Sequence, residues 1–384
     1  MAQWNRVPLI DYIELIGGGT PKTTVPEYWN GNIPWLSVKD FNNDKRYVYS
    51  TEKHISHSGF ENSPTKMLHK DDIIISARGT VGEIAMIPFD MAFNQSCYGI
   101  RASRGIDKPF LYYLLKNCIS QLKRMTHGSV FDTITRDTFA NIEVDIPDAE
   151  TQKRISSVLA DIDNKIEVND AINDNLQQQA AALFSSLYDR SNTEVRFTDL
   201  IQILGGGTPK TGENTYWNGN IAFFTPKDVG IPYTLITEKT ISKEGLSHCN
   251  SRLYPVNTVF VTARGTVGKV GMSGVPMAMN QSCYALVGKE THQLLVYFYT
   301  LKAVDRLKHK ASGAVFDAIT TRDFESEQIM KLSDDDATAF LRVAEPMFQE
   351  VLNNNIENLR LSTLRDSLLP KLMSGEIDVS AVQL

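Results

Sequence analysis

The chain contains two copies of one module. Residues 17–22 (GGGTPK) recur as residues 205–210, and residues 28–33 (YWNGNI) recur as residues 216–221, both at an offset of 188. Further identities follow in the same order at offsets of 186 and then 185: TEK, ARGTVG, NQSCY and a final Gly-x-Val-Phe-Asp. Collinear repeats with so little drift predict a duplicated structural unit of about 145 residues.

A long helix is predicted after the first copy. Residues 148–190 contain neither glycine nor proline, and apolar residues recur at helical spacing. That stripe consists of Ile155, Leu159, Ile162, Ile166, Leu176, Ala180 and Leu183. Asn169 and Asn173 fall on the stripe, where polar residues in a coiled coil set register and partner at some cost in stability. At 1.5 Å per residue, the helix would extend roughly 60 Å.

A second long helix is predicted after the second copy. Ser333 with Asp336 forms a capping-box start. The apolar stripe continues through Met347, Val351, Leu361, Leu368 and Leu372. Pro346 and Pro370 are expected to break or kink this helix, because proline removes a backbone donor and clashes with the preceding turn.

The modules themselves combine short strands with one amphipathic helix each. Strands are predicted at residues 73–76, 83–87 and 259–262, and helices at 109–125 and about 293–310. We therefore predict an α+β protein in which two duplicated mixed α/β domains are separated and joined by two long helices. The expected segments are 1–148 (first domain), 149–190 (central helix), 191–331 (second domain) and 332–384 (C-terminal helix).

The charge is distributed unevenly along these segments. The whole chain has 39 basic and 45 acidic side chains, a net charge of −6 that by itself argues against a polyanionic partner. The four segments, however, carry net charges of −1, −3, +3 and −5. The acidity lies in the helices, so the two domains remain suited to nucleic acid.

Several catalytic classes are excluded by missing motifs. The segment 17–23 lacks the second glycine of a phosphate-binding P-loop, and there is no G-x-G-x-x-G, H-E-x-x-H, C-x-x-C or G-x-S-x-G. The chain also lacks the Pro-Pro dipeptide expected in the catalytic loop of an adenine methyltransferase. His54 and His57 have no third metal ligand, which favours a surface loop. We predict a chain without catalysis of its own and without a metal.

The remaining composition indicates an intracellular protein. Asn5, Arg6, Asp11 and Glu14 interrupt the apolar run that a signal peptide requires, and no stretch of 18 uncharged apolar residues exists. The four cysteines, Cys97, Cys118, Cys249 and Cys283, are too few for a disulfide framework and are expected to be reduced core thiols.

The repeated loops have the composition of a nucleic-acid interface. GGGTPK, YWNG, Lys39-Asp40 with Lys227-Asp228, ARGTVG and NQS supply backbone N–H groups, hydroxyls and isolated cations. Such groups contact phosphates, and Arg, Asn and Gln side chains reach base edges. The two tryptophans of YWNG, Trp29 and Trp217, are better interpreted as module core.

With these motifs in place, the whole chain resembles the specificity (S) subunits of type I restriction-modification systems. The resemblance rests on the doubled GGGTPK…YWNGNI, the doubled ARGTVG and NQS, and the closing residues 361–377 (LSTLRDSLLPKLMSGEI). It implies two target-recognition domains that each recognise one half of a bipartite double-stranded DNA site. It also implies that the long helices pair as an antiparallel coiled coil that sets the gap between the half-sites.

The resemblance further implies a set of partners. Two modification (methyltransferase) subunits would dock on the helical region and methylate adenine with S-adenosylmethionine. Restriction/translocase subunits, where present, would join to cleave DNA. S-adenosylmethionine, ATP and Mg would bind to those partner subunits, and no cofactor to this chain, in a cytoplasmic complex without membrane contact.

Candidate DNA-binding residues fall into two groups. Positions identical in both copies cannot explain different half-sites, so they are assigned to turns, core and phosphate contacts, and divergent positions to discrimination. The repeated candidates are Lys22, Lys39, Arg78, Thr80, Asn94, Gln95, Lys210, Lys227, Arg264, Thr266, Asn280 and Gln281. The divergent candidates are Lys45, Arg46, Tyr47, His127 and Ser129 in the first copy and Tyr233, Ser251, Arg252 and Ser312 in the second.

The helices supply candidate subunit-docking residues. They are Asp161, Glu167, Asn169, Asn173, Leu176, Val351, Leu361 and Leu368. An acidic outer face suits a protein partner, although a solvated helix surface would have the same composition. Two further hypotheses remain open: a stand-alone sequence-specific DNA-binding regulator or architectural protein, and a duplicated ligand-binding or scaffolding protein without salt-dependent DNA affinity.

Overall fold

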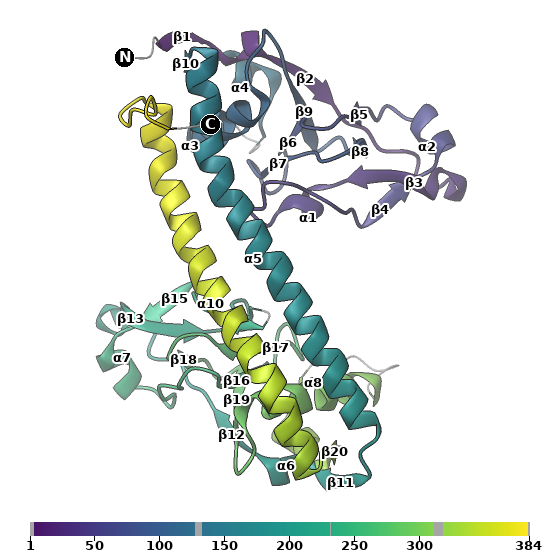
Figure 1. Ribbon diagram of the computed structural model, residues 1–384, viewed down its shortest axis with the longest axis vertical. Helices are drawn as coiled ribbons and strands as arrows, with labels where there is room; N and C mark the ends of the chain where they lie inside the picture. The colour runs from purple at the N-terminus through teal and green to yellow at the C-terminus, as the bar shows by residue number, and fades with distance from the viewer. Residues whose placement is uncertain (1–3, 127–132, 231, 311–317, 383–384) are drawn as a thin grey trace. The chain divides into compact units, whose positions relative to one another are not determined.

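The computed structural model describes residues 4–126, 133–230, 232–310 and 318–382, with only the backbone described for residues 120–126. The chain divides into two compact units. Unit 1 contains residues 1–168 and 359–384, and unit 2 contains residues 169–358. Each unit therefore combines one mixed domain with part of each long helix (Figure 1).

The two long helices are α5 (Ala149–Asp189) and α10 (Asp334–Met373), which pack antiparallel. The helix predicted at 148–190 is confirmed. The start of α10 is also confirmed, because the Ser333 hydroxyl accepts the Asp336 N–H at 3.1 Å. Of the two outcomes expected at the prolines, the break is wrong, since α10 continues through Pro346 and Pro370, and the kink stays a prediction.

Burial explains why α10 survives its prolines. An interior proline costs a helix about 3 kcal/mol. Around Pro346, however, Phe340 and Ala344 are fully buried and Phe348 is 3% exposed. Each large side chain buried contributes roughly 1.5–3 kcal/mol, so packing offsets the lost hydrogen bond. Near Pro370, the turn is continued by the Ser374 N–H, which donates to the Pro370 carbonyl at 3.0 Å.

Asparagine side chains lie at the interface between the two helices in unit 2. Asn169 Nδ2 donates to Glu357 Oε2 at 2.7 Å and to Asn358 Oδ1 at 2.8 Å. Asn173 Nδ2 donates to Asn355 Oδ1, and Asn173 Oδ1 accepts from Asn354 Nδ2, both at 2.9 Å. Because a shift along the seam would leave these buried amides unpaired, they set the register, as their place on the apolar stripe predicted.

The described residues of unit 1 form three sheets. A two-stranded antiparallel pair joins β1 (Trp4–Pro8) to β10 (Glu143–Pro147). A four-stranded antiparallel sheet has the order β2 (Ile13–Gly17), β9 (Cys97–Ala102), β6 (Ile73–Ser76), β7 (Ile84–Met86). A four-stranded mixed sheet has the order β4 (Lys53–Ile55), β3 (Trp29–Leu36), β8 (Met91–Phe93), β5 (Met67–Leu68), with β3 and β8 parallel. The helices are α1 (Val38–Phe41), α2 (His57–Glu61), α3 (Lys108–Thr126) and α4 (Arg136–Ala140), with 3-10 turns at Leu9–Tyr12 and Pro26–Tyr28.

Unit 2 repeats this arrangement with small differences. Its pair is β11 (Thr193–Arg196) with β20 (Gln328–Lys331). Its larger sheet has the order β12 (Ile201–Gly205), β19 (Cys283–Gly288), β16 (Val259–Thr262), β17 (Val270–Ser273), β14 (Tyr233–Thr234). Its third sheet has the order β15 (Lys239–Ile241), β13 (Trp217–Phe224), β18 (Met277–Met279). The helices are α6 (Phe197–Leu200), α7 (Lys243–Ser247), α8 (Gln293–Lys310) and α9 (Thr321–Ser326), with a 3-10 turn at Asn214–Tyr216.

The core of each unit joins its domain to its part of the helix pair. In unit 1, α3 packs in one apolar cluster with α5 residues Ile155 and Leu159 and α10 residue Leu372. In unit 2, the cluster centres on Phe184 of α5. The ring of Phe184 lies 4.9 Å from Phe298 and 5.5 Å from Phe340, centroid to centroid. The domains are thus bound to the helices by core packing within each unit.

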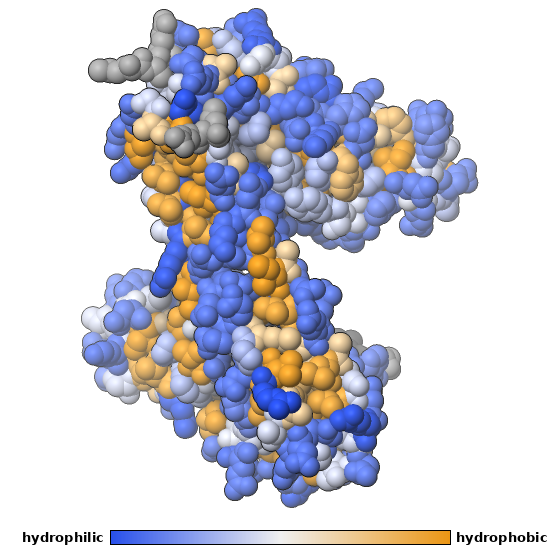
Figure 2. Space-filling view, viewed as in Figure 1, coloured by the Kyte–Doolittle hydropathy of each residue, from blue (hydrophilic) through white to orange (hydrophobic). Residues whose placement is uncertain are grey.

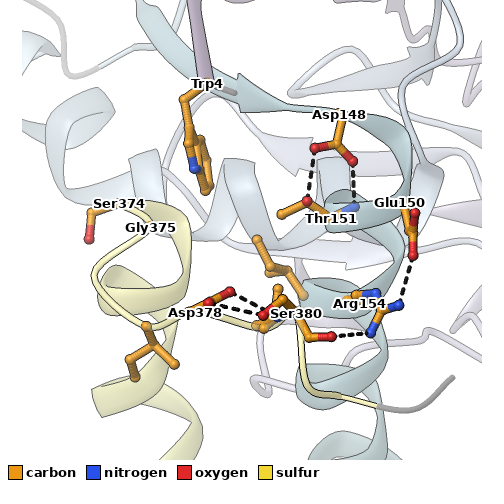
Figure 3. Close-up of a pocket in the computed structure, with 12 residues that line it drawn as sticks. Trp4, Asp148, Glu150, Thr151, Arg154, Ser374, Gly375, Asp378 and Ser380 are labelled. Atoms are coloured by element: carbon orange, nitrogen blue, oxygen red, sulfur yellow. Dashed lines mark hydrogen bonds and ion pairs between the residues drawn. The ribbon is translucent and has the colours of Figure 1, made fainter. Parts of the chain in front are cut away.

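The C-terminal segment of unit 1 packs beside the start of α5 (Figure 3). Asp148 caps α5, with its Oδ1 accepting the Thr151 N–H at 2.9 Å. Arg154 donates to the Ser380 carbonyl at 2.9 Å and also pairs with Glu150. A hollow of about 450 Å³ remains between Trp4, the helix start and residues 374–380.

Candidate nucleic-acid interface

In the first domain, the GGGTPK loop lies against the NQS turn. A Cβ on Gly18 would lie 2.1 Å from the Asn94 carbonyl oxygen, so no other residue fits there. The Gly19 N–H donates to the Phe93 carbonyl at 2.9 Å, and Thr20 Oγ1 donates to Gln95 Oε1. Because Gln95 uses its oxygen in this bond, its amide N–H groups remain available as donors. Lys22, in the same loop, is exposed.

The ARGTVG turn lies on the other side of the NQS turn. The Ser76 hydroxyl holds the turn by two hydrogen bonds, donating to the Thr80 carbonyl at 2.5 Å and accepting the Glu83 N–H at 2.8 Å. The Arg78 N–H donates to the Ser96 carbonyl at 3.2 Å, and Gly79 adopts φ +79°. Arg78 and Thr80 are exposed. Among the described residues, no protein acceptor pairs with the N–H groups of Gly79 and Thr80. The turn thus presents a cation beside free backbone donors, which suits a phosphate.

The short helix α1 (Val38–Phe41) carries the first Lys-Asp pair, Lys39-Asp40. Asp40 Oδ2 accepts from the Ser37 N–H at 2.7 Å, and Asp40 Oδ1 accepts from the Glu52 N–H at 2.8 Å. Asp40 therefore holds the backbone, while the adjacent Lys39 is exposed. In the Lys39-Asp40 pair, the acid is therefore structural and the lysine faces solvent.

The ARGTVG turn, the NQS turn and α1 (Val38–Phe41) line one hollow of about 470 Å³, which brings together Lys39, Arg78, Thr80 and Asn94 of the predicted site. We call the GGGTPK loop, the ARGTVG turn, the NQS turn and α1 the loop cluster. The remaining lining residues are Trp35, Ser37, Val38, Asn42, Glu52, Lys53, Gly79 and Ser96.

The second domain repeats the hydrogen bonds of the loop cluster. As at Gly18, a Cβ on Gly206 would clash with the carbonyl of the NQS turn, here that of Asn280. Thr208 donates to Gln281. Thr262 corresponds to Ser76, since its hydroxyl donates to the Thr266 carbonyl and accepts the Lys269 N–H. Asp228 holds the Thr225 and Glu238 N–H groups as Asp40 holds its own partners. The predicted residues Lys210, Lys227, Arg264, Thr266 and Gln281 are exposed, and Asn280 is half-buried, as is Asn94.

Three lysines near the loop cluster were not predicted, namely Lys53, Lys239 and Lys308. Lys53 and Lys239 lie over the rings of Trp29 and Trp217, each 5.7 Å from the centroid. The repeated TEK motif was the signal that could have found them. Lys308 of α8 lies beside the ARGTVG turn of the second domain, since a Cβ on Gly268 would come within 3.3 Å of its Nζ. Its counterpart at an offset of 185 is also a lysine.

The divergent candidates of the first domain lie against α5. The Arg46 guanidinium bonds to Asn164 and, at 3.5 Å, to the Ala160 carbonyl, and the side chain is 9% exposed. Tyr47 lies beneath Arg46, with the guanidinium 4.9 Å from its ring. Lys45 is exposed but engaged in an interaction. In this structure Arg46 is therefore not available to a base edge.

The divergent candidates of the second domain differ in their exposure to solvent. Tyr233 is buried, and its hydroxyl donates to Asn257 Oδ1 at 3.0 Å. Ser251 accepts the Met279 N–H at 3.0 Å, and Arg252 is exposed. His127, Ser129 and Ser312 lie outside the described residues.

The predicted docking residues also fall into different environments. Asp161 is exposed, and Leu176, Leu361 and Leu368 are half-buried. Asn169, Asn173 and Val351 are buried within unit 2, where they hold the unit together and offer little surface to a partner. Glu167 faces the first domain: burial raises the pKa of its carboxyl, an effect that Arg46 opposes.

Exposed apolar side chains on the long helices were not predicted. Among the described residues they are Val168, Ile172, Val343 and Leu364, between 39% and 53% exposed. Figure 2 shows apolar side chains among the polar ones on the face of the molecule that it draws. Val168, Ile172, Val343 and Leu364 lie off the apolar stripe, which supplied six of the eight docking candidates, so the periodicity that revealed the helices did not point to them.

The described residues contain no group of three or more side chains suited to hold a metal ion. His57 instead approaches Glu61, Nε2 to Oε1, at 3.3 Å. Nor does the described part of the chain include a helix with the length and apolar character needed to cross a bilayer. Burial raises the pKa of Cys97 and Cys283, both in NQSCY segments, to about 12, which makes them poor nucleophiles.

The same domain occurs twice in the chain. Each copy carries the loop cluster and packs on an antiparallel pair of long helices. This arrangement defines a class of duplicated, helix-linked recognition proteins. Within that class, the chain belongs to the family described as type I restriction modification DNA specificity domain, whose model matches residues 1–178 and 190–331. It is thus a specificity subunit, itself non-catalytic.

The relatives agree with this assignment. The chain is 24% identical to the type I restriction enzyme MjaIX specificity subunit of Methanocaldococcus jannaschii, over 98% of this chain and 94% of that protein. It is 25% identical to the HindI specificity subunit of Haemophilus influenzae, over 70% of this chain and 77% of that protein. The fold is similar to a crystal structure of the S subunit from M. genitalium (TM-score 0.59, 15% identity, 97% of this chain and 96% of that one).

Proposed function

We propose that each domain recognises one half of a bipartite double-stranded DNA target, with residues 1–148 and 191–331 as the two target-recognition domains. The observation that supports this most is the duplication of the loop cluster with its supporting hydrogen bonds intact. Two equivalent surfaces on one chain suit a ligand that offers two sites, as a duplex does.

Within each loop cluster, the identical cations are assigned to phosphates. The candidates are Lys22, Lys39, Arg78, Lys210, Lys227 and Arg264, joined by Lys308. Phosphate contacts fix register without carrying sequence information, which is why they can be the same in both domains. The two domains together carry +2 and the helical segments −8, so the duplex would meet the domains.

The long helices are proposed to set the gap and to dock two modification subunits. The α5 helix is 41 residues long, roughly 60 Å, and exceeds one 34 Å turn of DNA. The proposed docking residues are Asp161, Val168 and Leu364 in unit 1 and Ile172 and Val343 in unit 2, since apolar anchors surrounded by polar groups are typical of protein interfaces. S-adenosylmethionine, ATP and Mg would be bound by the modification and restriction subunits, in the cytoplasm.

Methylation mapping tests the proposal. The chain is expressed with its modification subunits, and methylated adenines are mapped across a genome. We expect one motif with two defined halves and an unspecified gap. A continuous motif would overturn the proposal, and tight specific DNA binding by the chain alone with no methylation would favour the stand-alone regulator.

Removing one phosphate contact tests the assignment within the loop cluster. We expect Arg78→Ala and Arg264→Ala each to weaken DNA binding by the complex about tenfold and to reduce the salt dependence by about one counterion, with both half-sites unchanged. Fluorescence anisotropy at several salt concentrations measures this. Arg104→Ala, an exposed arginine paired with Asp11, is the control and should change neither value. A changed base preference would show instead that the arginine contacts bases.

A further inference from the structure

One segment of the first domain is attached to both long helices by charged and polar side chains. This segment, residues 42–49, lies within residues 41–50, one of the places where the two domain sequences diverge, and we call it the anchor segment. Asp44 Oδ2 accepts from Arg365 Nη2 of α10 at 2.8 Å, and Asp44 Oδ1 pairs with Lys116 of α3 at 2.7 Å. One carboxylate thus joins the domain to α10.

Arg365 extends this contact to α5. Its Nη1 donates to Asp163 Oδ1 at 2.8 Å, and Asp163 Oδ2 accepts from the Tyr113 hydroxyl at 2.6 Å. The side chains of Arg365 and Asp163 are 4% and 5% exposed. A buried charge pair of this kind is sensitive to geometry, because a displaced partner leaves a charge without compensation.

A second set of contacts lies further along the anchor segment. Arg46 bonds to Asn164 and the Ala160 carbonyl, and its Nε lies 3.8 Å from Glu167 Oε1. The Tyr49 hydroxyl donates to Glu167 Oε2 at 3.3 Å. The anchor segment is therefore held at two places, at Asp44 and at Arg46 with Tyr49, which limits rotation of the domain about either contact.

The corresponding segment of the second domain, residues 229–236, meets its helix differently. Tyr233 packs against Phe348 with ring centroids 6.5 Å apart, and both residues belong to one apolar core with Leu352. Tyr233 of the second domain thus contacts α10 through an apolar side chain, whereas Asp44 of the first domain contacts α10 through an ion pair with Arg365. The divergence between the two copies at this place thus coincides with two different ways of attaching a domain to a helix.

We propose that the anchor segment sets the orientation of the first domain on the helix pair, with Asp44, Arg46 and Arg365 as positioning residues, and that it does not select bases. The proposal rests on the proposed function, in which two domains recognise half-sites across a fixed gap. Each base pair added to the gap moves a half-site by about 3.4 Å and rotates it by about 35°. Discrimination between neighbouring gap lengths therefore requires a domain that cannot tilt or turn.

Two variants test the proposal in the complete methyltransferase complex. Asp44→Asn alters a side chain that is 65% exposed, and Arg46→Met keeps the length of the buried side chain while removing its charge. We expect methylation at sites with a gap one base pair longer or shorter to rise roughly tenfold relative to the natural gap. The bases of both half-sites should be unchanged. Asp11→Asn, which breaks the Asp11–Arg104 pair away from the helices, is the matched control and should leave the gap preference as it is.

The outcomes separate this inference from the proposed function. If the unaltered complex methylates no split motif, the proposed function fails. If it does, but Asp44→Asn retains full gap discrimination, the anchor role is overturned. A change in half-site bases with Arg46→Met would also overturn it, because Arg46 would then be a base contact. Should Arg46→Met fail to assemble, Asp44→Asn alone decides.

Discussion

Inserting seven residues into both long helices is expected to lengthen the gap of the DNA target, by about three base pairs at most. A heptad adds about 10 Å of helix, the rise of about three base pairs, and this sets the upper limit. It returns within about 20° of its original rotational phase, whereas each base pair turns the duplex by about 35°, so the twist favours a smaller increase. The insertions belong between Val168 and Asn169 in α5 and between Asn358 and Leu359 in α10, at the division between the two units. Every hydrogen bond described above then stays within its own unit. Methylation mapping measures the new gap, and both half-sites should be unaltered.

The control is a heptad inserted into α5 alone. It lengthens α5 against α10, so the pairing of the two helices cannot hold in both units at once, and either the buried asparagines of unit 2 or the Asp163–Arg365 pair of unit 1 must lose its partners. Each unpaired buried amide costs about 1–3 kcal/mol, so this variant should lose stability and methylation together. A doubly inserted complex that methylates at the original gap would show that helix length does not set the spacing.

Replacing Phe184 by alanine is expected to lower the free energy of unfolding of unit 2 by about 3–5 kcal/mol. Phe184 is 1% exposed and packs against four rings, those of Tyr188, Phe298, Tyr299 and Phe340. These rings come from the long helices and from the domain helix α8, so the cavity would lie where they meet. Because most single substitutions cost far less, the loss would stand out.

Urea denaturation of the full chain, followed by circular dichroism, measures the effect. Ile172→Ala provides the control, since Ile172 lies on the same helix and is 42% exposed. It should change stability by less than about 0.5 kcal/mol. A loss below about 1.5 kcal/mol for Phe184→Ala would mean that the neighbouring rings close the cavity.

The parts of the fold that could be predicted are those with a local signal. The absence of glycine and proline from 148 to 190 indicated α5, and exact repetition indicated the duplicated domain. Pro346 misled the prediction because its local cost is outweighed by the burial of Phe340 and Phe348, which depends on residues far along the chain. Local propensity cannot represent that compensation.

The residues of the candidate nucleic-acid interface also divide into those with a local sequence signal and those without one. Glycines and short polar side chains of the loop cluster were identified because their function needs a particular local backbone, as at Gly18 and Gly79. Arg46 was expected at the DNA because a cation in a divergent loop is normally solvated. Its partners Asn164 and Glu167 are more than a hundred residues away, and Asp44 meets Arg365 across 321 positions. No pattern in the sequence distinguishes a cation that faces solvent from one that is buried against a distant helix.

The unequal burial of the four cysteines has a practical consequence for chemical labelling. Cys97, Cys118 and Cys283 are buried, with pKa values raised by burial to about 12, about 11 and about 12, whereas Cys249 is only half-buried. Alkylating reagents attack the thiolate, so a maleimide dye applied to the native chain would react first at Cys249. A single fluorophore could then be placed on the second domain of the natural sequence, without any substitution, to observe that domain as the complex assembles on DNA.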